Sequence, residues 1–222
     1  MRQPLHSALL CRVTNAHNRQ TQLHVDDNRR RLVARAHGVV LEIAAGTGRN
    51  AEFYDAAKVH RLIVTDASAQ MLEAARHKRV AVAAVEYVKA DAHRLSEAVP
   101  SASVDCVVDT FGLCSFEDPA AVLQEVRRVL KPGGVALLLE HGRSPTNVVL
   151  NWWLDFRAPA HAERWGCLVR VSARARALIR RCRVQANRDV MGLVHEAAGF
   201  DLVDARTAQM GTVFEIAARK SG

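Results

Sequence analysis

Val39-Val40-Leu41-Glu42-Ile43-Ala44-Ala45-Gly46-Thr47-Gly48-Arg49-Asn50 is the segment from which the architecture of this chain is predicted. It begins with a β-branched apolar run that ends at an acid, a pattern typical of a buried strand. Small residues follow, and residues 49–58 then mix polar and apolar side chains as a helix does. A strand, a turn of small residues and a helix let a nucleotide-like cofactor touch the backbone, because larger side chains would block its approach. The N–H groups at the start of the helix would also be free to bind it.

The glycines of this turn do not match the dinucleotide-binding pattern. That pattern has the spacing G-x-G-x-x-G, whereas this turn has Gly46 and Gly48, with Ala44 in the first position. The spacing argues against a dehydrogenase that binds pyrophosphate. It resembles instead the acid-x-G-x-G-x-G turn of class I methyltransferases, which bind S-adenosyl-L-methionine (SAM), with Ala44 in place of the first glycine. A tight strand-to-helix turn in another kind of α/β protein is the alternative.

The composition indicates one globular domain. The chain has 222 residues, of which 49% are apolar and 24% charged, and no apolar run is long enough to span a bilayer. The net charge of +8 permits nucleic acid, anionic lipid or acidic protein as partners, but it selects none of them. The five cysteines are odd in number and form no CxxC pair, so we predict a reducing compartment and no metal site.

Acids follow several of the predicted strands. Asp66 follows a strand over residues 61–65, about 20 residues beyond the glycine turn, where an acid can accept hydrogen bonds from both ribose hydroxyls. Capping of the next helix, predicted over 68–78, is the alternative role of Asp66. Asp91 follows a strand over 85–88 and could equally cap its own turn, and Asp109 follows a strand over 103–108.

The remaining elements complete a doubly wound α/β pattern. A helix is predicted over 26–37, and Asp118-Pro119 begins another, with Asp as N-cap and Pro in the first turn. Residues 131–134 end that helix, and a strand follows over 135–140. A short helix over 189–198 and two closing strands over 200–206 and 212–219 end the chain.

Several motifs beyond the glycine turn resemble the class I SAM-dependent methyltransferase superfamily. The likeness is greatest to the branch with ubiquinone C-methyltransferases, thiol methyltransferases and fungal mitochondrial inner-membrane methyltransferase-like proteins. It covers about residues 26–168 and resumes near Arg188. It implies a Rossmann-like, doubly wound sheet of seven strands with an antiparallel C-terminal strand, and SAM as cofactor. The motifs that carry it are Asp118-Pro119, Arg128-Val129-Leu130-Lys131-Pro132-Gly133-Gly134, Glu140-His141-Gly142-Arg143-Ser144 and His161-Ala162-Glu163-Arg164-Trp165-Gly166-Cys167.

The resemblance also implies the cofactor contacts. Glu42 would face the methionine amine, Asp66 the ribose and Asp91 the adenine. Two histidines, His141 and His161, are candidate bases, but a structural role is favoured for each of them, so no catalytic residue is assigned. The full set of predicted cofactor-binding residues is Glu42, Ala44, Gly46, Thr47, Gly48, Asn50, Asp66, Ala67, Asp91, Ala92 and Asp109.

Residues 1–25 contain arginines but no acid, as mitochondrial targeting segments do. A basic N-terminal arm that stays on the protein is the alternative. The domain would then run from 26 to 222. Because the fungal group in the resemblance is mitochondrial as well, we predict a mitochondrial location.

Two segments near the C-terminus suggest partners. Trp152, Trp153 and Phe156 could form a lid, a peripheral membrane contact or ordinary core. Residues 164–188 form an insert with eight arginines and no acid, which suits RNA or a ribonucleoprotein but also a solvated helix. Two functions therefore stay open. The first is a methyltransferase that acts on a small molecule such as a quinone or thiol, or on RNA. The second is a scaffold of methyltransferase fold in a mitochondrial RNA–protein complex such as the mitoribosome.

Overall fold

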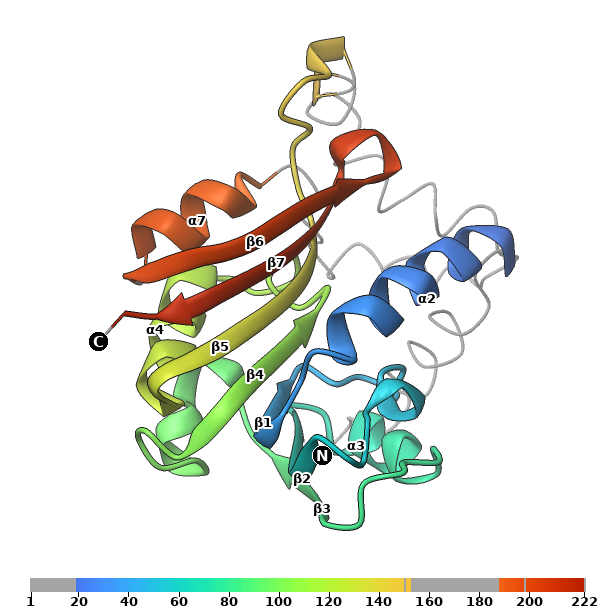
Figure 1. The fold of residues 1–222 in the computed structure, drawn as a ribbon, viewed down its shortest axis with the longest axis vertical. Helices are drawn as coiled ribbons and strands as arrows, with labels where there is room; N and C mark the ends of the chain where they lie inside the picture. The colour runs from blue at the N-terminus through green and yellow to red at the C-terminus, as the bar shows by residue number, and fades with distance from the viewer. Residues whose placement is uncertain (1–18, 150, 153–187, 198, 222) are drawn as a thin grey trace, which may run out of the picture.

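A computed structural model describes residues 19–149, 151–152, 188–197 and 199–221. Its centre is a single seven-stranded sheet with the order β3-β2-β1-β4-β5-β7-β6 (Figure 1). The strands are β1 (Gly38–Ile43), β2 (Val59–Asp66), β3 (Val85–Lys89), β4 (Val104–Thr110), β5 (Leu130–His141), β6 (Phe200–Ala208) and β7 (Val213–Lys220).

The sheet confirms the predicted fold class. Strands β1 to β5 pair in parallel, whereas β7 runs antiparallel between β5 and β6. Hydrophobic residues alternate between the two faces of the sheet, so that each face needs a covering layer of helices. Figure 1 shows β4, β5, β7 and β6 side by side, with the closing hairpin beside the C-terminal helix.

Helices cover both faces of the sheet. Among the described residues, the α-helices are α2 (Arg19–Val33), α3 (Ala69–Arg76), α4 (Pro119–Val129) and α7 (Val190–Ala197), and the short 3-10 helices are η1 (Ala51–Phe53), η2 (Ala92–Glu97) and η3 (Gln209–Gly211). Leu41 of β1 belongs to the apolar cluster that includes buried residues of α4 and α7, and its neighbour Val40 belongs to the cluster with α2 and α3. No helix among the described residues is both long and apolar enough to cross a membrane.

Local signals fixed the starts of two helices as predicted. The carboxylate of Asp118 accepts a hydrogen bond from the Ala121 N–H at 3.0 Å, and Pro119 occupies the first turn of α4. Ser68 caps α3, its hydroxyl accepting from the Met71 N–H at 3.4 Å. Such caps depend on residues three positions apart, which is why they can be recognised from the chain alone.

Other predicted boundaries were wrong. No α-helix forms over 49–58, where only η1 and turns are found. The helix predicted over 26–37 begins at Arg19 and ends at Val33, so residues 19–25 of the predicted arm are helical. Residues 131–134, predicted to separate helix from strand, lie within β5. Residues 1–18 and most of the arginine-rich insert, 164–187, lie outside the described residues.

Candidate active site

The topological switch point of the sheet lies between β1 and β4. These strands are neighbours, but their connections leave in opposite directions, toward β2 on one side and β5 on the other. In doubly wound sheets, ligands bind at this switch point, at the carboxyl ends of the strands. The residues at these ends are Glu42 of β1, Asp66 of β2, Asp109 and Thr110 of β4, and Glu140 and His141 of β5.

The small-residue turn after β1 has the backbone conformation that a close approach requires. Gly46 and Gly48 have φ values of 57° and 73°, and Ala44 has φ 48°, in the left-handed region that favours glycine. A Cβ at Gly48 would lie 3.0 Å from Ala75 of α3, so this glycine also allows the turn to pack on that helix. A Cβ at Gly46 would meet no atom closer than 4.0 Å, which leaves the outer side of the turn open.

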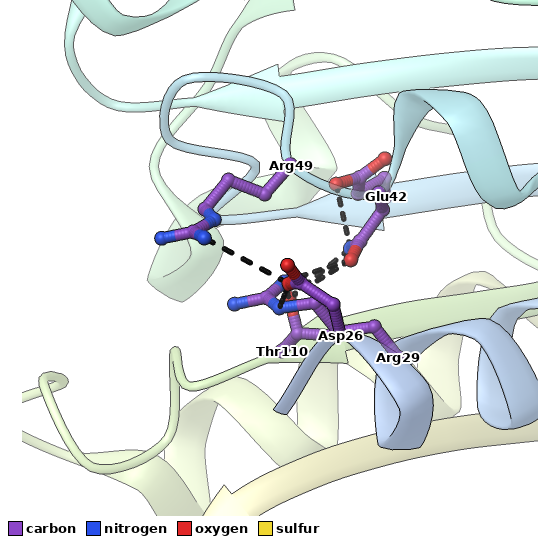
Figure 2. A network of polar contacts seen from close by, with 6 residues as sticks. Asp26, Arg29, Glu42, Arg49 and Thr110 are labelled. Carbon is purple, nitrogen blue, oxygen red and sulfur yellow. Dashed lines mark hydrogen bonds and ion pairs between the residues drawn. The ribbon is translucent and has the colours of Figure 1, made fainter. Parts of the chain in front are cut away.

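Glu42 is held inside a polar network (Figure 2). Its carboxylate accepts hydrogen bonds from the Asn50 amide at 2.9 Å and from the Tyr54 hydroxyl at 2.7 Å. Burial raises the pKa of Glu42 from 4.5 to about 7, although the bonds from Tyr54 and Asn50 oppose that rise. The same two bonds explain why η1 and turns form instead of the helix predicted over 49–58, because they draw the chain between residues 50 and 54 toward β1.

Arg29 of α2 completes this network from a distant part of the chain. Its guanidinium donates to Asn50 Oδ1 at 2.8 Å and to Thr110 Oγ1 at 2.7 Å, and so connects the end of β4 with the segment that follows the glycine turn. Asp26 lies 3.9 Å from Arg29 and 3.7 Å from Arg49 of the glycine turn, as Figure 2 shows. Burial, followed by the charge of Arg49, lowers the pKa of Arg29 from 12.5 to about 10.

Asp66 holds the backbone on both sides of its strand end, whereas Ser68 is the residue that caps α3, and the predicted contact of Asp66 with the ribose stays a prediction. Its carboxylate accepts from the Gly46 N–H at 2.9 Å and from the Ser68 N–H at 2.8 Å, one bond to each oxygen. Burial raises the pKa of Asp66, and these two bonds oppose the rise. A carboxylate offers about four lone-pair positions, so two bonds leave acceptor capacity for ribose hydroxyls.

Asp91 performs the local role that was the alternative for it. It accepts from the His93 N–H at 2.9 Å and lies 2.9 Å from the His93 ring, which lowers its pKa. Its side chain is largely exposed, and the predicted contact with adenine stays a prediction. Of the small residues predicted beside these acids, Ala67 is exposed and Ala92 is buried, while Thr47 is buried within the glycine turn.

Asp109 has a side chain that is enclosed by the protein, and its predicted contact with the cofactor stays a prediction. It is fully buried and accepts from the Gly112 N–H at 3.1 Å. Glu140, also fully buried, accepts from the N–H groups of Gly112, Leu113 and Cys114 at 3.0 to 3.2 Å. Burial raises the pKa of both carboxyls, so the pair retains a proton near neutral pH and shapes the loop after β4.

An aromatic pair lies at the carboxyl ends of β4 and β5. The Phe111 and His141 rings are stacked, with centroids 4.4 Å apart and an interplanar angle of 30°. Phe111 has φ 63°, which is unusual for a residue other than glycine, and the Arg29 guanidinium lies 5.1 Å from its centroid. Burial, and then the charge of Arg29, lower the pKa of His141 from 6.5 to about 4. The other predicted base, His161, lies outside the described residues.

Comparison with known proteins identifies the family. A family model described as a methyltransferase domain matches residues 41–138. The ubiquinone/menaquinone biosynthesis C-methyltransferase UbiE of Pseudomonas fluorescens is 31% identical over 185 residues, which cover 81% of this chain and 71% of UbiE. This chain belongs to the class I SAM-dependent methyltransferases. The match to "Methyltransferase OMS1, mitochondrial" of Saccharomyces cerevisiae is 30% identical over 210 residues and covers 87% of this methyltransferase, which spans 41% of the yeast protein.

A solved structure agrees with the fold. A SAM-dependent methyltransferase from Thermotoga maritima superposes with a TM-score of 0.64 at 20% identity, covering 96% of this methyltransferase and 99% of the other chain. The enzyme uses SAM as its cofactor, and SAM supplies an electrophilic methyl group on a sulfonium. The residues present fit that group, because the open side of the glycine turn admits it and Asp66 has acceptor capacity for a ribose. Glu42 would balance the charge of an amine.

Three residues that build this site are absent from the set of predicted site residues. Arg29 was seen only as part of a charged helix, although it is buried and bridges β4 and the glycine turn. Tyr54 was assigned to a helix, and Glu140 was noted only within a motif. An acid directly at the end of an apolar strand was the one signal that could have indicated Glu140, as it did for Glu42.

Proposed function

We propose that this methyltransferase methylates a small, largely apolar acceptor of the quinol class. The observation that carries the proposal is the stacked Phe111–His141 pair, which gives the carboxyl ends of β4 and β5 an aromatic surface. The acids nearest to this pair, Asp109 and Glu140, are fully buried and bonded within the protein, so they offer no charged contact to an acceptor. The similarity to UbiE, a ubiquinone/menaquinone biosynthesis C-methyltransferase, supports the same substrate class. A thiol is the neighbouring possibility within small acceptors.

The test has two stages. Equilibrium dialysis of the full chain with labelled SAM should show saturable binding, and no binding by folded protein at millimolar SAM would contradict the use of this cofactor. The protein is then incubated with methyl-labelled SAM and either a short-chain 2-methoxy-6-alkyl-1,4-benzoquinol or an aliphatic thiol. We expect label in the quinol. Label in the thiol alone, or in neither probe while SAM binds, would contradict the proposed acceptor class.

We also propose a mitochondrial location. The acid-free, arginine-bearing segment 1–25 supports it, and so does the mitochondrial designation of the yeast relative. Imaging of the full chain with a fluorescent protein fused to its C-terminus tests the location. The fusion should coincide with a mitochondrial marker, and a diffuse cytosolic signal would contradict the proposal.

A second candidate function is that of a scaffold in a mitochondrial RNA–protein complex such as the mitoribosome, with little or no catalysis. The observation in its favour is the run of eight arginines without an acid over 164–188. Arginines that neutralise phosphates release counterions, so binding should weaken steeply with salt. Recovery of RNA from mitochondria on the tagged chain, at low and high salt, tests it. Salt-sensitive recovery of one structured RNA, lost when these arginines become glutamine, is expected; recovery of protein alone would contradict it.

A peripheral membrane contact near Trp152 and Trp153 is proposed in addition. Val148, Val149 and Trp152 have 78%, 77% and 65% of their surface exposed, which is unusual for large apolar side chains. Trp153 lies outside the described residues. Cosedimentation with cardiolipin-containing vesicles should fall for Trp152→Ser compared with the wild type. Equal cosedimentation of the two proteins would contradict this contact.

A further inference from the structure

His141 is the last residue of β5, and its side chain forms no hydrogen bond with any described residue. Its ring is half-buried against Phe111, but no described residue forms a hydrogen bond with either ring nitrogen. The ring is only partly buried, and neither nitrogen is among the buried side-chain atoms that lack a partner. No described residue occupies these nitrogens, so a ligand at the carboxyl edge of the sheet can bond to them.

A chain of side-chain contacts leads from the predicted cofactor residues to this ring. Glu42, which the resemblance places against the methionine part of SAM, is bonded to Asn50, and Asn50 is bonded to Arg29. Figure 2 shows this first part of the path between the end of β1, the glycine turn and α2. The Arg29 guanidinium lies over Phe111, which stacks on His141. His141 is thus separated from the Glu42 network by one side-chain layer, on the side of β4 and β5.

The strand geometry separates His141 from the buried carboxyl pair. Successive side chains along a strand point to opposite faces, so Glu140 and His141 face different sides of β5. Glu140 is satisfied by three backbone N–H groups of the loop after β4. His141 meets Phe111 instead, and Phe111 packs with the apolar cluster on the α2 side of the sheet. Glu140 therefore stabilises the loop after β4, whereas His141 contributes to the aromatic pair with Phe111.

We infer that His141 is the group that accepts the proton which the acceptor loses on methylation, an assignment that rests on the proposed function. In this step a bond forms between a ring carbon of the quinol and the methyl carbon while the sulfonium S–C bond breaks. The proton that this ring carbon carried passes to a ring nitrogen of His141 and then to water. The products are the C-methylated quinol, S-adenosylhomocysteine and, after the proton leaves, the neutral imidazole again. For a thiol acceptor the S–H proton takes the same path.

The surroundings keep the ring in the form that this step needs. Burial and the positive charge of Arg29 disfavour the imidazolium, so the ring is unprotonated and ready to accept at neutral pH. A low basicity is sufficient, because a quinol ring carbon that has received a methyl group but still carries its proton is a far stronger acid than imidazolium. Arg29 also disfavours retention of the proton on the ring, which promotes its release to water.

The first test separates this role from packing. His141→Phe keeps a ring against Phe111 but removes both nitrogens, and His60→Phe makes the same change at an exposed position of β2. With the benzoquinol probe we expect His141→Phe to lower kcat by about 10²- to 10⁴-fold, the usual contribution of general base catalysis. The dissociation constant for SAM, from equilibrium dialysis, should stay within about threefold of the wild type. His60→Phe should change neither quantity. Wild-type turnover by His141→Phe would overturn the inference.

The second test uses the wild-type protein and needs no turnover. The histidines are labelled with carbon-13, the His141 signal is identified by its absence from His141→Phe, and S-adenosylhomocysteine is added to saturation. Addition of the benzoquinol or the thiol should then shift the His141 ring signal, while the His60 signal stays in place. If neither probe moves the His141 signal, the inference is overturned even where SAM binding is intact. Failure of SAM to bind in dialysis would instead contradict the proposed function.

Discussion

Replacement of Glu42 by glutamine should remove most of one pH-dependent contribution to stability. The amide has nearly the same shape, and it can still accept from Asn50 and donate to the Tyr54 oxygen. In the wild type, burial raises the Glu42 pKa to about 7 from the 4.5 expected in the unfolded chain. A pKa raised by folding contributes stability that is present below the unfolded value and is lost as the pH rises through the folded value. Glu42→Gln should therefore gain stability relative to the wild type over that interval.

The size of this effect follows from the two pKa values. Between pH 5 and pH 8 the difference in unfolding free energy, variant minus wild type, should increase by about 2 to 3 kcal/mol. For a domain of this size the urea midpoint should shift by about 1 M over the same range. The measurement is urea unfolding followed by circular dichroism at several pH values, without cofactor.

A carboxylate on the protein surface provides the control for Glu42→Gln. Glu73→Gln makes the same change on the exposed surface of α3 and controls for the loss of one carboxylate from the chain. Because Asp109 and Glu140 titrate in both proteins, only the difference between the variant and the wild type isolates Glu42. If the two proteins differ by a constant amount from pH 5 to pH 8, Glu42 does not titrate as its burial requires, and the argument from desolvation is refuted.

Three further changes test other parts of the site. Asp66→Ala removes the acceptor proposed for the ribose, and SAM binding measured by dialysis should weaken by about ten- to a hundredfold, equivalent to roughly 1.5 to 3 kcal/mol; unchanged binding would exclude this contact. Ala44→Gly should stabilise the fold against urea by about 0.5 to 1 kcal/mol, because φ is 48° at this residue, and destabilisation would show that the methyl group packs usefully. Gly112→Ala should destabilise by about 2 to 3 kcal/mol in thermal unfolding, since its Cβ would lie 2.2 Å from Asp109 Oδ1, and a wild-type melting temperature would contradict this contact.

Most of the sheet could be predicted because strand patterns and helix caps depend on residues close in the chain. The apolar run before Glu42 and the Asp118-Pro119 start of α4 are examples, and the structure confirms both. The glycine turn was recognised from residue size alone, and its left-handed φ values explain why small residues are needed there. Asp66 could be placed at the end of its strand for the same local reason.

The polar site could not be predicted in the same way, because its partners are far apart in the chain. Arg29 meets Thr110 across 81 positions, and Asp109 is brought near Glu140 only by the parallel pairing of β4 with β5. The helix expected over 49–58 had an adequate local pattern, but the bonds of Asn50 and Tyr54 to Glu42 outweigh it. Local composition thus determined the strands, the turn and the family resemblance. The charge state of Glu42, the direction of Asp109 and the unbonded ring of His141 depend on burial and on distant partners, which exist only once the sheet has formed.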